Sequence, residues 1–421
     1  SVILYKNKDM RLVIIGLMML FVVSCQQTPN KEVTMKQDVA VLAADQMGGR
    51  QTGTPGELLA AAYIIERFSA IGLTPKGSEG LFTQTFSFTP SANPHEQSEF
   101  TNIQKDGSVT GTNVIGYINN NASTTVIIGA HYDHLGMGGE GSLDREKPAI
   151  HNGADDNASG IAILLALAEK LKNQSPTITQ NNYLFMAFSG EEMGLLGSNY
   201  FVKTPTIDTK KVSYMINMDM VGRLNKEKTL AVYGVGTSSL FKQTLFANND
   251  QGLTINEHQS GVGPSDHTSF YLADIPVLHF FTGQHADYHK PGDDPEKLNY
   301  EGMERISNYI LNIVTDLDDA GQLVFKKTKN ESEEVPMFKV ALGVVPDYLF
   351  NGQGMRIDGI SEGKPAQKAE LQRGDIVVKL GTIDTPDMMS YMKALASFEE
   401  GATTTVTVNR DGALVERQVT F

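Results

Sequence analysis

A chain of 421 residues is too long for one ordinary hydrophobic core, so two domains are expected. Apolar residues make up 40% and charged residues 20%, as in ordinary globular proteins. The formal net charge is −14, and no basic stripe is present that could neutralise phosphates, which excludes nucleic acid as a partner. The single cysteine, Cys25, excludes an intrachain disulfide.

The N-terminal residues have the pattern of an export signal. Residues 12–23 are an uninterrupted apolar run after Arg11, too short to span a bilayer comfortably but suited to a secretory signal. The run leads into Ser24-Cys25, which resembles a bacterial lipobox with cleavage before Cys25 and lipid on its thiol. We therefore predict a lipoprotein signal peptide over 1–24, a polar tether over 25–34, and an exported protein of the bacterial cell envelope, anchored to the membrane through Cys25. A plain signal peptide with a chance cysteine nearby is the alternative.

The apolar spacing predicts alternating strands and helices along residues 35–322. Helices are expected over 55–73, 161–172, 238–248 and 300–317, and strands over 82–88, 113–118, 124–129, 183–188, 212–217 and 276–281. A turn-rich segment separates the second strand from the third, which predicts a hairpin. The alternation predicts an α/β fold, with a mixed, largely parallel sheet flanked by helices, and such sheets carry their sites at the carboxyl ends of strands.

Acidic and imidazole side chains occur where these strands end. They are His131 and Asp133 after 124–129, Glu191 and Glu192 after 183–188, Asp219 after 212–217, and His289 in the loop after 276–281. The Gly/Asn/Asp loop at 152–160 precedes the helix at 161–172 and adds Asp155 and Asp156. Neutral imidazole with carboxylate is a ligand set for zinc, with manganese or cobalt as alternatives. The competing interpretation of the loop is that Asp156, Asn157 or Ser159 simply caps the helix.

Five motifs of this part of the chain match a known family. They are Gly-Ala-His-Tyr-Asp at 129–133, Asn-Gly-Ala-Asp-Asp-Asn-Ala-Ser-Gly at 152–160, Phe-Ser-Gly-Glu-Glu at 188–192, Asn-Met-Asp-Met-Val-Gly at 217–222, and Tyr288-His289. Together they resemble the co-catalytic di-zinc aminopeptidases of metallopeptidase family 28, over roughly residues 35–321.

The resemblance implies a role for each motif residue. Asp155 would bridge two Zn²⁺ ions, and the peptide bond between Asp155 and Asp156 would be cis. The remaining assignments follow the motifs: His131 and Asp219 complete one metal site, Glu192 and His289 complete the other, Glu191 is the general base, Asp133 orients the ring of His131, and Tyr288 stabilises the tetrahedral intermediate.

Three other late histidines compete with His289 as the fifth ligand. His267 and His285 lie in neighbouring loops, and His279 lies inside an apolar strand, where a core histidine is expected. The resemblance favours the Tyr-His motif, and therefore His289.

The C-terminal part resembles a second family. A charged, apolar-poor segment predicts a linker over 323–336, and residues 337–421 have the length of a small domain. The segment 373–381, which reads Arg-Gly-Asp-Ile-Val-Val-Lys-Leu-Gly after a short Pro-Ala helix, resembles a small β-rich PDZ domain. Such a domain implies binding of a peptide C-terminus, with the carboxylate loop at 340–344, although the standard Gly-Leu-Gly-Phe loop is absent. A domain that only packs on the peptidase is the alternative.

These expectations combine into a secreted, lipid-anchored metallo-aminopeptidase that hydrolyses N-terminal residues from peptides. A glutaminyl cyclase, which has a related fold but uses a single zinc, is one alternative. A non-catalytic surface binding protein on the same fold is another, although relatives of that kind lack the metal ligands that are present in this sequence.

Overall fold

The computed structural model describes residues 34–90, 98–101, 107–139, 141–144, 147–174, 178–328, 340–347, 350, 352–361 and 363–421. The predicted signal peptide, Cys25 and most of the predicted linker lie outside these residues. Within them, no helix combines the length and the apolar character that crossing a membrane requires.

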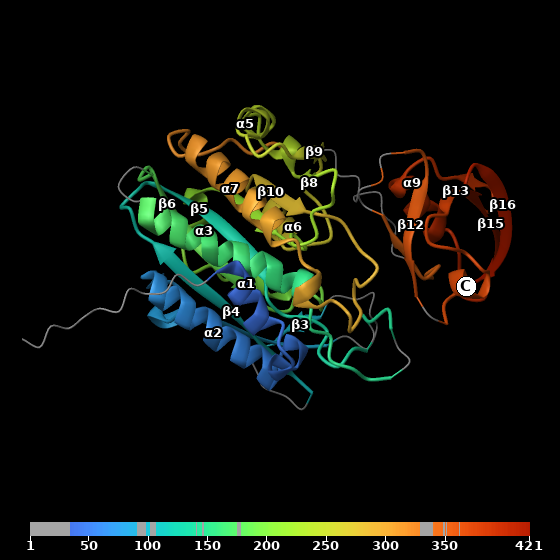
Figure 1. Ribbon diagram of the computed structural model, residues 1–421, viewed down its shortest axis with the longest axis horizontal. Coiled ribbons are helices and arrows are strands. Elements are labelled where there is room, and N and C mark those ends of the chain that lie inside the picture. The colour runs from blue at the N-terminus through green and yellow to red at the C-terminus, as the bar shows by residue number, and fades with distance from the viewer. Residues whose placement is uncertain are drawn as a thin grey trace, which may run out of the picture. The chain divides into compact units, whose positions relative to one another are not determined.

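Ten strands of the described residues form one mixed sheet (Figure 1). Their order is β3-β2-β4-β6-β5-β7-β10-β8-β9, with β1 paired to β4. The bounds are β1 Thr74–Pro75, β2 Thr83–Thr89, β3 Glu99–Phe100, β4 Val109–Ile118, β5 Thr124–His131, β6 Asn181–Phe188, β7 Val212–Met218, β8 Thr229–Tyr233, β9 Thr254–Glu257 and β10 Val277–Phe281. The central strands β6, β5, β7 and β10 run parallel, whereas β4–β6 and β10–β8 are antiparallel. The predicted α/β fold class is confirmed.

The predicted hairpin between the strands now seen as β4 and β5 is wrong, because β6 lies between them. Strand β6 pairs antiparallel with β4, where Val114 faces Ala187, and parallel with β5, where Ile128 faces Phe185. Every residue of β5 and β6 is buried, so both strands need a hydrogen-bonded neighbour along each edge. Strand β6, which comes later in the chain, is the neighbour that β4 and β5 share. The turn-rich segment between β4 and β5 gives no sign of this insertion.

Helices cover both faces of the sheet. On one face lie α1 (Met35–Leu42), α2 (Pro55–Ile71), α3 (Gly160–Gln174), α5 (Phe241–Ala247) and α7 (Tyr300–Asp316), with α3 and α7 side by side (Figure 1). On the other face lie α4 (Leu196–Lys203) and α6 (His267–Tyr271). The helix predicted over 55–73 begins after the cap Thr54, with Pro55 in its first turn, and ends at Gly72, whose φ of 85° favours glycine.

The C-terminal residues form a second, smaller antiparallel sheet in the order β11-β12-β13-β15-β16, with β14 beside β13. Its elements are β11 Val344–Pro346, β12 Met355–Ile360, α8 Pro365–Lys368, β13 Ile376–Leu380, β14 Ile383–Asp384, α9 Met388–Ala396, β15 Thr403–Arg410 and β16 Ala413–Thr420. It has its own core, which includes Ile357, Val377, Val406 and Tyr391. A separate core is what a small independent domain requires.

Candidate metal centre

Four strands deliver the candidate side chains to one edge of the large sheet. Strand β5 ends at His131, and the segments that follow β6, β7 and β10 carry Glu191 and Glu192, Asp219, and His289. Because these strands are parallel neighbours, their carboxyl ends lie together. The structure therefore brings these predicted residues into one cluster.

The first group of metal-ligating atoms consists of His131, Asp156 and Asp219. His131 Nε2 lies 3.3 Å from Asp219 Oδ1 and 3.4 Å from Asp156 Oδ1. Donor atoms placed around a tetrahedral zinc ion, at bond lengths near 2.0–2.2 Å, are about 3.3 Å apart. The observed separations match this spacing.

The second group of donor atoms lies around Oδ2, the other carboxylate oxygen of Asp156. His289 Nε2 is 3.1 Å from Asp156 Oδ2 and 3.3 Å from Glu192 Oε2. A second imidazole, that of His134, is 2.7 Å through Nδ1 from Glu192 Oε1, and it also belongs to a metal-ligating group with Asp156 and Glu192. Since the two carboxylate oxygens of Asp156 face different histidines, Asp156 has the geometry of a bridging ligand.

The expectation that Asp155 bridges the metals is wrong by one residue. Asp155 Oδ1 accepts a hydrogen bond from the Gly222 amide at 2.6 Å, and Oδ2 lies 3.2 Å from His285 Nε2. The expected cis peptide bond is displaced in the same way, because it joins Asp156 to Asn157 and not Asp155 to Asp156. Of the three cap candidates, Asn157 makes the capping contact, because its Oδ1 accepts a hydrogen bond from the amide of Gly160, the first residue of α3, at 3.0 Å. The Asp156 carboxylate lies among the histidines instead.

Electrostatics within the cluster are dominated by burial and by close opposite charges. Although burial opposes it, the neighbours Asp219 and Glu191 raise the pKa of His131 well above its usual value. The pKa of His289 is raised in the same way by Glu192 and Asp156 against the effect of burial. The close carboxylates thus favour positive charge at this edge of the sheet, which is what a bound metal ion supplies.

The two adjacent glutamates differ in their surroundings. Burial raises the pKa of Glu191 well above its usual value, and Asp219 and Glu192 reinforce the shift against the opposing effect of His131. Burial also acts to raise the pKa of Glu192, but the nearby His289 and His134 outweigh it and lower the pKa to about 2. Glu192 is therefore the ligand-like member of the pair, whereas Glu191 has the perturbed pKa that a proton-transfer group requires.

Asp133 contacts both His131 and the segment that carries Glu191 and Glu192. His131 Nδ1 lies 3.2 Å from the backbone oxygen of Asp133 and 3.7 Å from its carboxylate, so the carbonyl is the nearer partner of the ring. The carboxylate of Asp133 accepts hydrogen bonds from the amides of Glu191 at 3.2 Å and Glu192 at 3.4 Å. Asp133 thus orients the glutamate pair as well as the first histidine.

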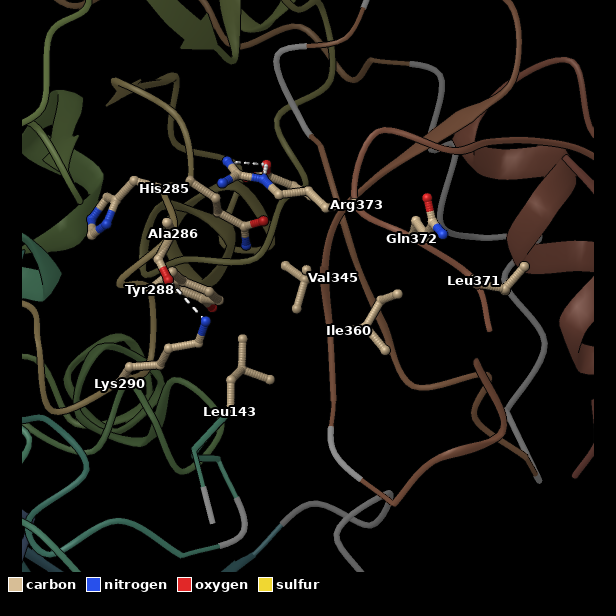
Figure 2. Close-up of a pocket in the computed structure, with 13 residues that line it drawn as sticks. Leu143, His285, Ala286, Tyr288, Lys290, Val345, Ile360, Leu371, Gln372 and Arg373 are labelled. Carbon is tan, nitrogen blue, oxygen red and sulfur yellow. Dashed lines mark hydrogen bonds and ion pairs between the residues drawn. The ribbon is translucent and has the colours of Figure 1, made fainter. Parts of the chain in front are cut away.

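The loop after β10 carries Tyr288 and Lys290 (Figure 2), with His289 between them in the sequence. The ring of Tyr288 stacks on that of His289 with centroids 3.9 Å apart, and Lys290 Nζ donates to the Ala286 carbonyl at 2.9 Å. His289 Nδ1 lies 2.9 Å from the Gly141 carbonyl, so its Nε2 is free to face the carboxylates. A backbone carbonyl in this position fixes the tautomer and orientation of a metal-ligating histidine.

The remaining histidines have other surroundings. His279 is buried in β10, with Nδ1 3.1 Å from Asn217 Nδ2, which agrees with the expected core histidine. His267 is also buried and stacks on His279 with centroids 4.3 Å apart. Neither belongs to a metal-ligating group of the described residues.

Sequence reasoning missed His134, although it stands directly beside the His131 motif. Its Nδ1 contacts Glu192, while Nε2 is buried without a hydrogen-bond partner. The available signal was a second histidine three residues after the first on the same strand end.

Two family models match parts of this chain. A family model described as peptidase family M28 matches residues 113–314, and a PDZ domain model matches residues 325–420, beginning inside the predicted linker. The chain is 31% identical over 208 residues to the alkaline phosphatase isozyme conversion protein of Escherichia coli, covering 49% of this chain and 55% of that one. It is 28% identical over 222 residues to a probable leucine aminopeptidase of Arthroderma otae, covering 50% and 58%. The chain therefore spans somewhat more than half the length of these curated relatives.

A solved Zn-dependent exopeptidase from Parabacteroides distasonis superposes with a TM-score of 0.54. It shares 17% sequence identity, and the match covers 67% of this chain and 97% of the exopeptidase. At this level of identity the likeness shows the fold.

The contrast between Asp155 and Asp156 is directly testable. We expect Asp156→Asn to lose bound zinc, because a neutral amide replaces the carboxylate shared by both groups. Asp155→Asn keeps an oxygen that accepts from Gly222, so its zinc affinity should stay within about tenfold of the wild type. Zinc content after dialysis, measured by atomic emission, checks both results. Loss of zinc from Asp155→Asn alone would contradict the assignment.

Proposed function

Because the chain carries a peptidase family M28 domain followed by a PDZ domain, we propose that it is a zinc-dependent aminopeptidase that removes N-terminal residues from peptides. The observation that carries the proposal is Asp156, whose two oxygens face His131 on one side and His289 on the other. A shared carboxylate between two histidine-containing groups suits a pair of ions. The relatives named as leucine aminopeptidases support cleavage at the N-terminus.

Six residues would form the centre. His131, Asp156 and Asp219 would hold one zinc, and Asp156, Glu192 and His289 the other, with His134 Nδ1 2.7 Å from Glu192 Oε1. When bound, the zinc ions would polarise the scissile carbonyl and lower the pKa values of the attacking water and of nearby carboxyl groups.

Glu191 performs the proton transfers. Its Oε2 lies 3.9 Å from His131 Nε2, beside the first group, and its side chain is 11% exposed, so water reaches it. The carboxylate accepts the proton of the attacking water and then donates it to the leaving amine. The backbone amide of Glu191 is bonded to Asp133, which keeps the glutamate at this position during both steps.

The two groups around Asp156 weigh against a glutaminyl cyclase, which uses a single zinc. The presence of histidine, aspartate and glutamate ligands together with Glu191 weighs against a non-catalytic binding protein. The proposal therefore remains with the two-metal peptidase.

We further propose that the protein is exported and anchored in the bacterial cell envelope by lipid on Cys25, as the apolar run before that residue indicates. The PDZ domain would bind a peptide C-terminus. Strand β11 pairs with β12 on one side, and among the described residues no strand pairs with its other edge. An extended peptide adds to an edge of this kind.

A panel of free and N-acetylated peptides tests the activity. We expect the purified full chain to release the first residue of free peptides, and to be inactive on acetylated ones and after treatment with a chelator. Cleavage of both sets at similar rates would contradict an aminopeptidase. Cyclisation of N-terminal glutamine without hydrolysis would favour the cyclase instead.

Glu191→Gln should separate catalysis from metal binding. The amide cannot accept the proton of water, so we expect a loss on the order of 10²–10⁴ in kcat with both zinc ions retained. The matched variant Glu192→Gln alters the neighbouring ligand and should lose zinc as well as activity. Full activity of Glu191→Gln would remove this residue from the mechanism.

Cys25→Ser tests the anchor. In bacterial cells supplied with labelled palmitate, we expect the full chain to take up label and to sediment with membranes, and Cys25→Ser to do neither. An unlabelled wild type that is nevertheless exported would favour a plain signal peptide.

A further inference from the structure

The loop 152–157, which carries Asp156, lies between two buried side chains of opposite charge. One is Arg50, at the end of the 3₁₀ segment Asp45–Arg50, and the other is Asp293, which follows the proposed ligand His289 by four residues. Both are 0% exposed. Neither belongs to a metal-ligating group of the described residues.

Arg50 donates hydrogen bonds only to backbone carbonyls. Its Nε contacts Tyr132 O at 2.6 Å, Nη1 contacts Leu42 O at 2.6 Å and Asn152 O at 2.7 Å, and Nη2 contacts Gly153 O at 2.9 Å. Tyr132 directly follows His131, and Asn152 and Gly153 precede Asp156. One guanidinium therefore joins the segments that carry His131 and Asp156, two of the three residues of the first group.

The backbone around Arg50 is shaped for this contact. Gly48, Gly49 and Arg50 all have positive φ, at 57°, 70° and 49°. A side chain on Gly49 would lie 2.5 Å from the Gly136 carbonyl, so only glycine allows the approach. The amide of His134 bonds to Arg50 O at 3.3 Å, which attaches the same turn to the His131 segment a second time.

Asp293 accepts the amides of the same loop. Its backbone oxygen bonds to Ala154 N at 3.0 Å, and its Oδ2 bonds to Asp155 N at 2.9 Å and to Asp156 N at 3.0 Å. The peptide group between Gly153 and Ala154 is thus bonded at both ends, its carbonyl to Arg50 and its amide to Asp293. Positive charge faces the carbonyl end and a negatively polarised oxygen faces the amide end, as the peptide dipole requires.

The charge of Arg50 is retained in this environment. Burial lowers its pKa to about 10, and Asp156, Asp133, Asp293 and Glu192 oppose that shift, so the guanidinium is protonated at neutral pH. No carboxylate forms a hydrogen bond with it among the described residues. Its charge therefore acts on the acidic centre as a whole.

We propose that Arg50 and Asp293 are positioning residues that determine the location of the Asp156 carboxylate, and through it the zinc affinity of the centre. The inference rests on the proposed function, because it assumes that Asp156 binds zinc. Partners that orient a ligand from outside the coordination sphere typically change metal affinity by about 10–100-fold when they are mutated. Arg50→Lys keeps the charge but loses the planar, forked set of donors, and Asp293→Asn keeps an acceptor but loses the charge.

The test measures zinc affinity of the full chain by competition with a chromophoric chelator, with the wild type measured first. We expect Arg50→Lys to bind zinc about 10–100-fold more weakly, and Asp293→Asn to weaken binding in the same direction. The matched control is Arg67→Lys. Arg67 is the other buried arginine of the described residues, and it pairs with Asp38 at 2.7 Å, with no contact to the loop. Its substitution should leave zinc affinity unchanged.

Three results would overturn the inference. The first is wild-type affinity in both Arg50→Lys and Asp293→Asn, and the second is an equal loss in Arg67→Lys. The third is failure of both variants to fold, by far-ultraviolet circular dichroism in saturating zinc, while Arg67→Lys folds, since the residues would then serve stability alone. A wild type that binds no zinc would contradict the proposed function itself, and this inference with it.

Discussion

The concentration of negative charge at one edge of the sheet is the constraint on which the rest of the structure depends. Asp133, Asp156, Glu191, Glu192 and Asp219 converge in a region with little access to water. Like charges so close together, and removed from water, are unfavourable unless cations balance them. These carboxylates raise the pKa values of His131 and His289, and metal cations are the partners that the geometry of the cluster suits.

The fold makes this concentration of charge tolerable. The central parallel strands are buried on both faces and provide rigid ends from which the ligands project. Irregular loops then supply the exact directions, and their backbone groups are bonded to side chains such as Arg50, Asp133 and Asp293. Backbone polar groups in a buried loop must find such partners, so the network that stabilises the loops also orients the ligands.

Adjacent carboxylates acquire different tasks in this setting. Asp155 and Asp156 are neighbours in sequence, but one faces the Gly222 amide and His285 while the other faces His131 and His289. Glu191 and Glu192 differ in the same way, because His289 and His134 contact only the second. In both pairs the two residues are of the same type, and contacts from distant segments of the chain give them different surroundings.

Local sequence patterns were enough to predict many of the secondary-structure elements and most of the candidate site residues. Periodic apolar runs predicted the helices and central strands, and the polar residues directly after those strands predicted His131, Glu191, Glu192, Asp219 and His289, because a strand end has a defined place in a parallel sheet. Only the tertiary structure decided that β6 separates β4 from β5, that Asp156 and not Asp155 faces the histidines, and that Arg50 and Asp293 contact their loop. These outcomes depend on backbone directions in irregular segments and on partners far apart along the chain, for which no local pattern carries a signal.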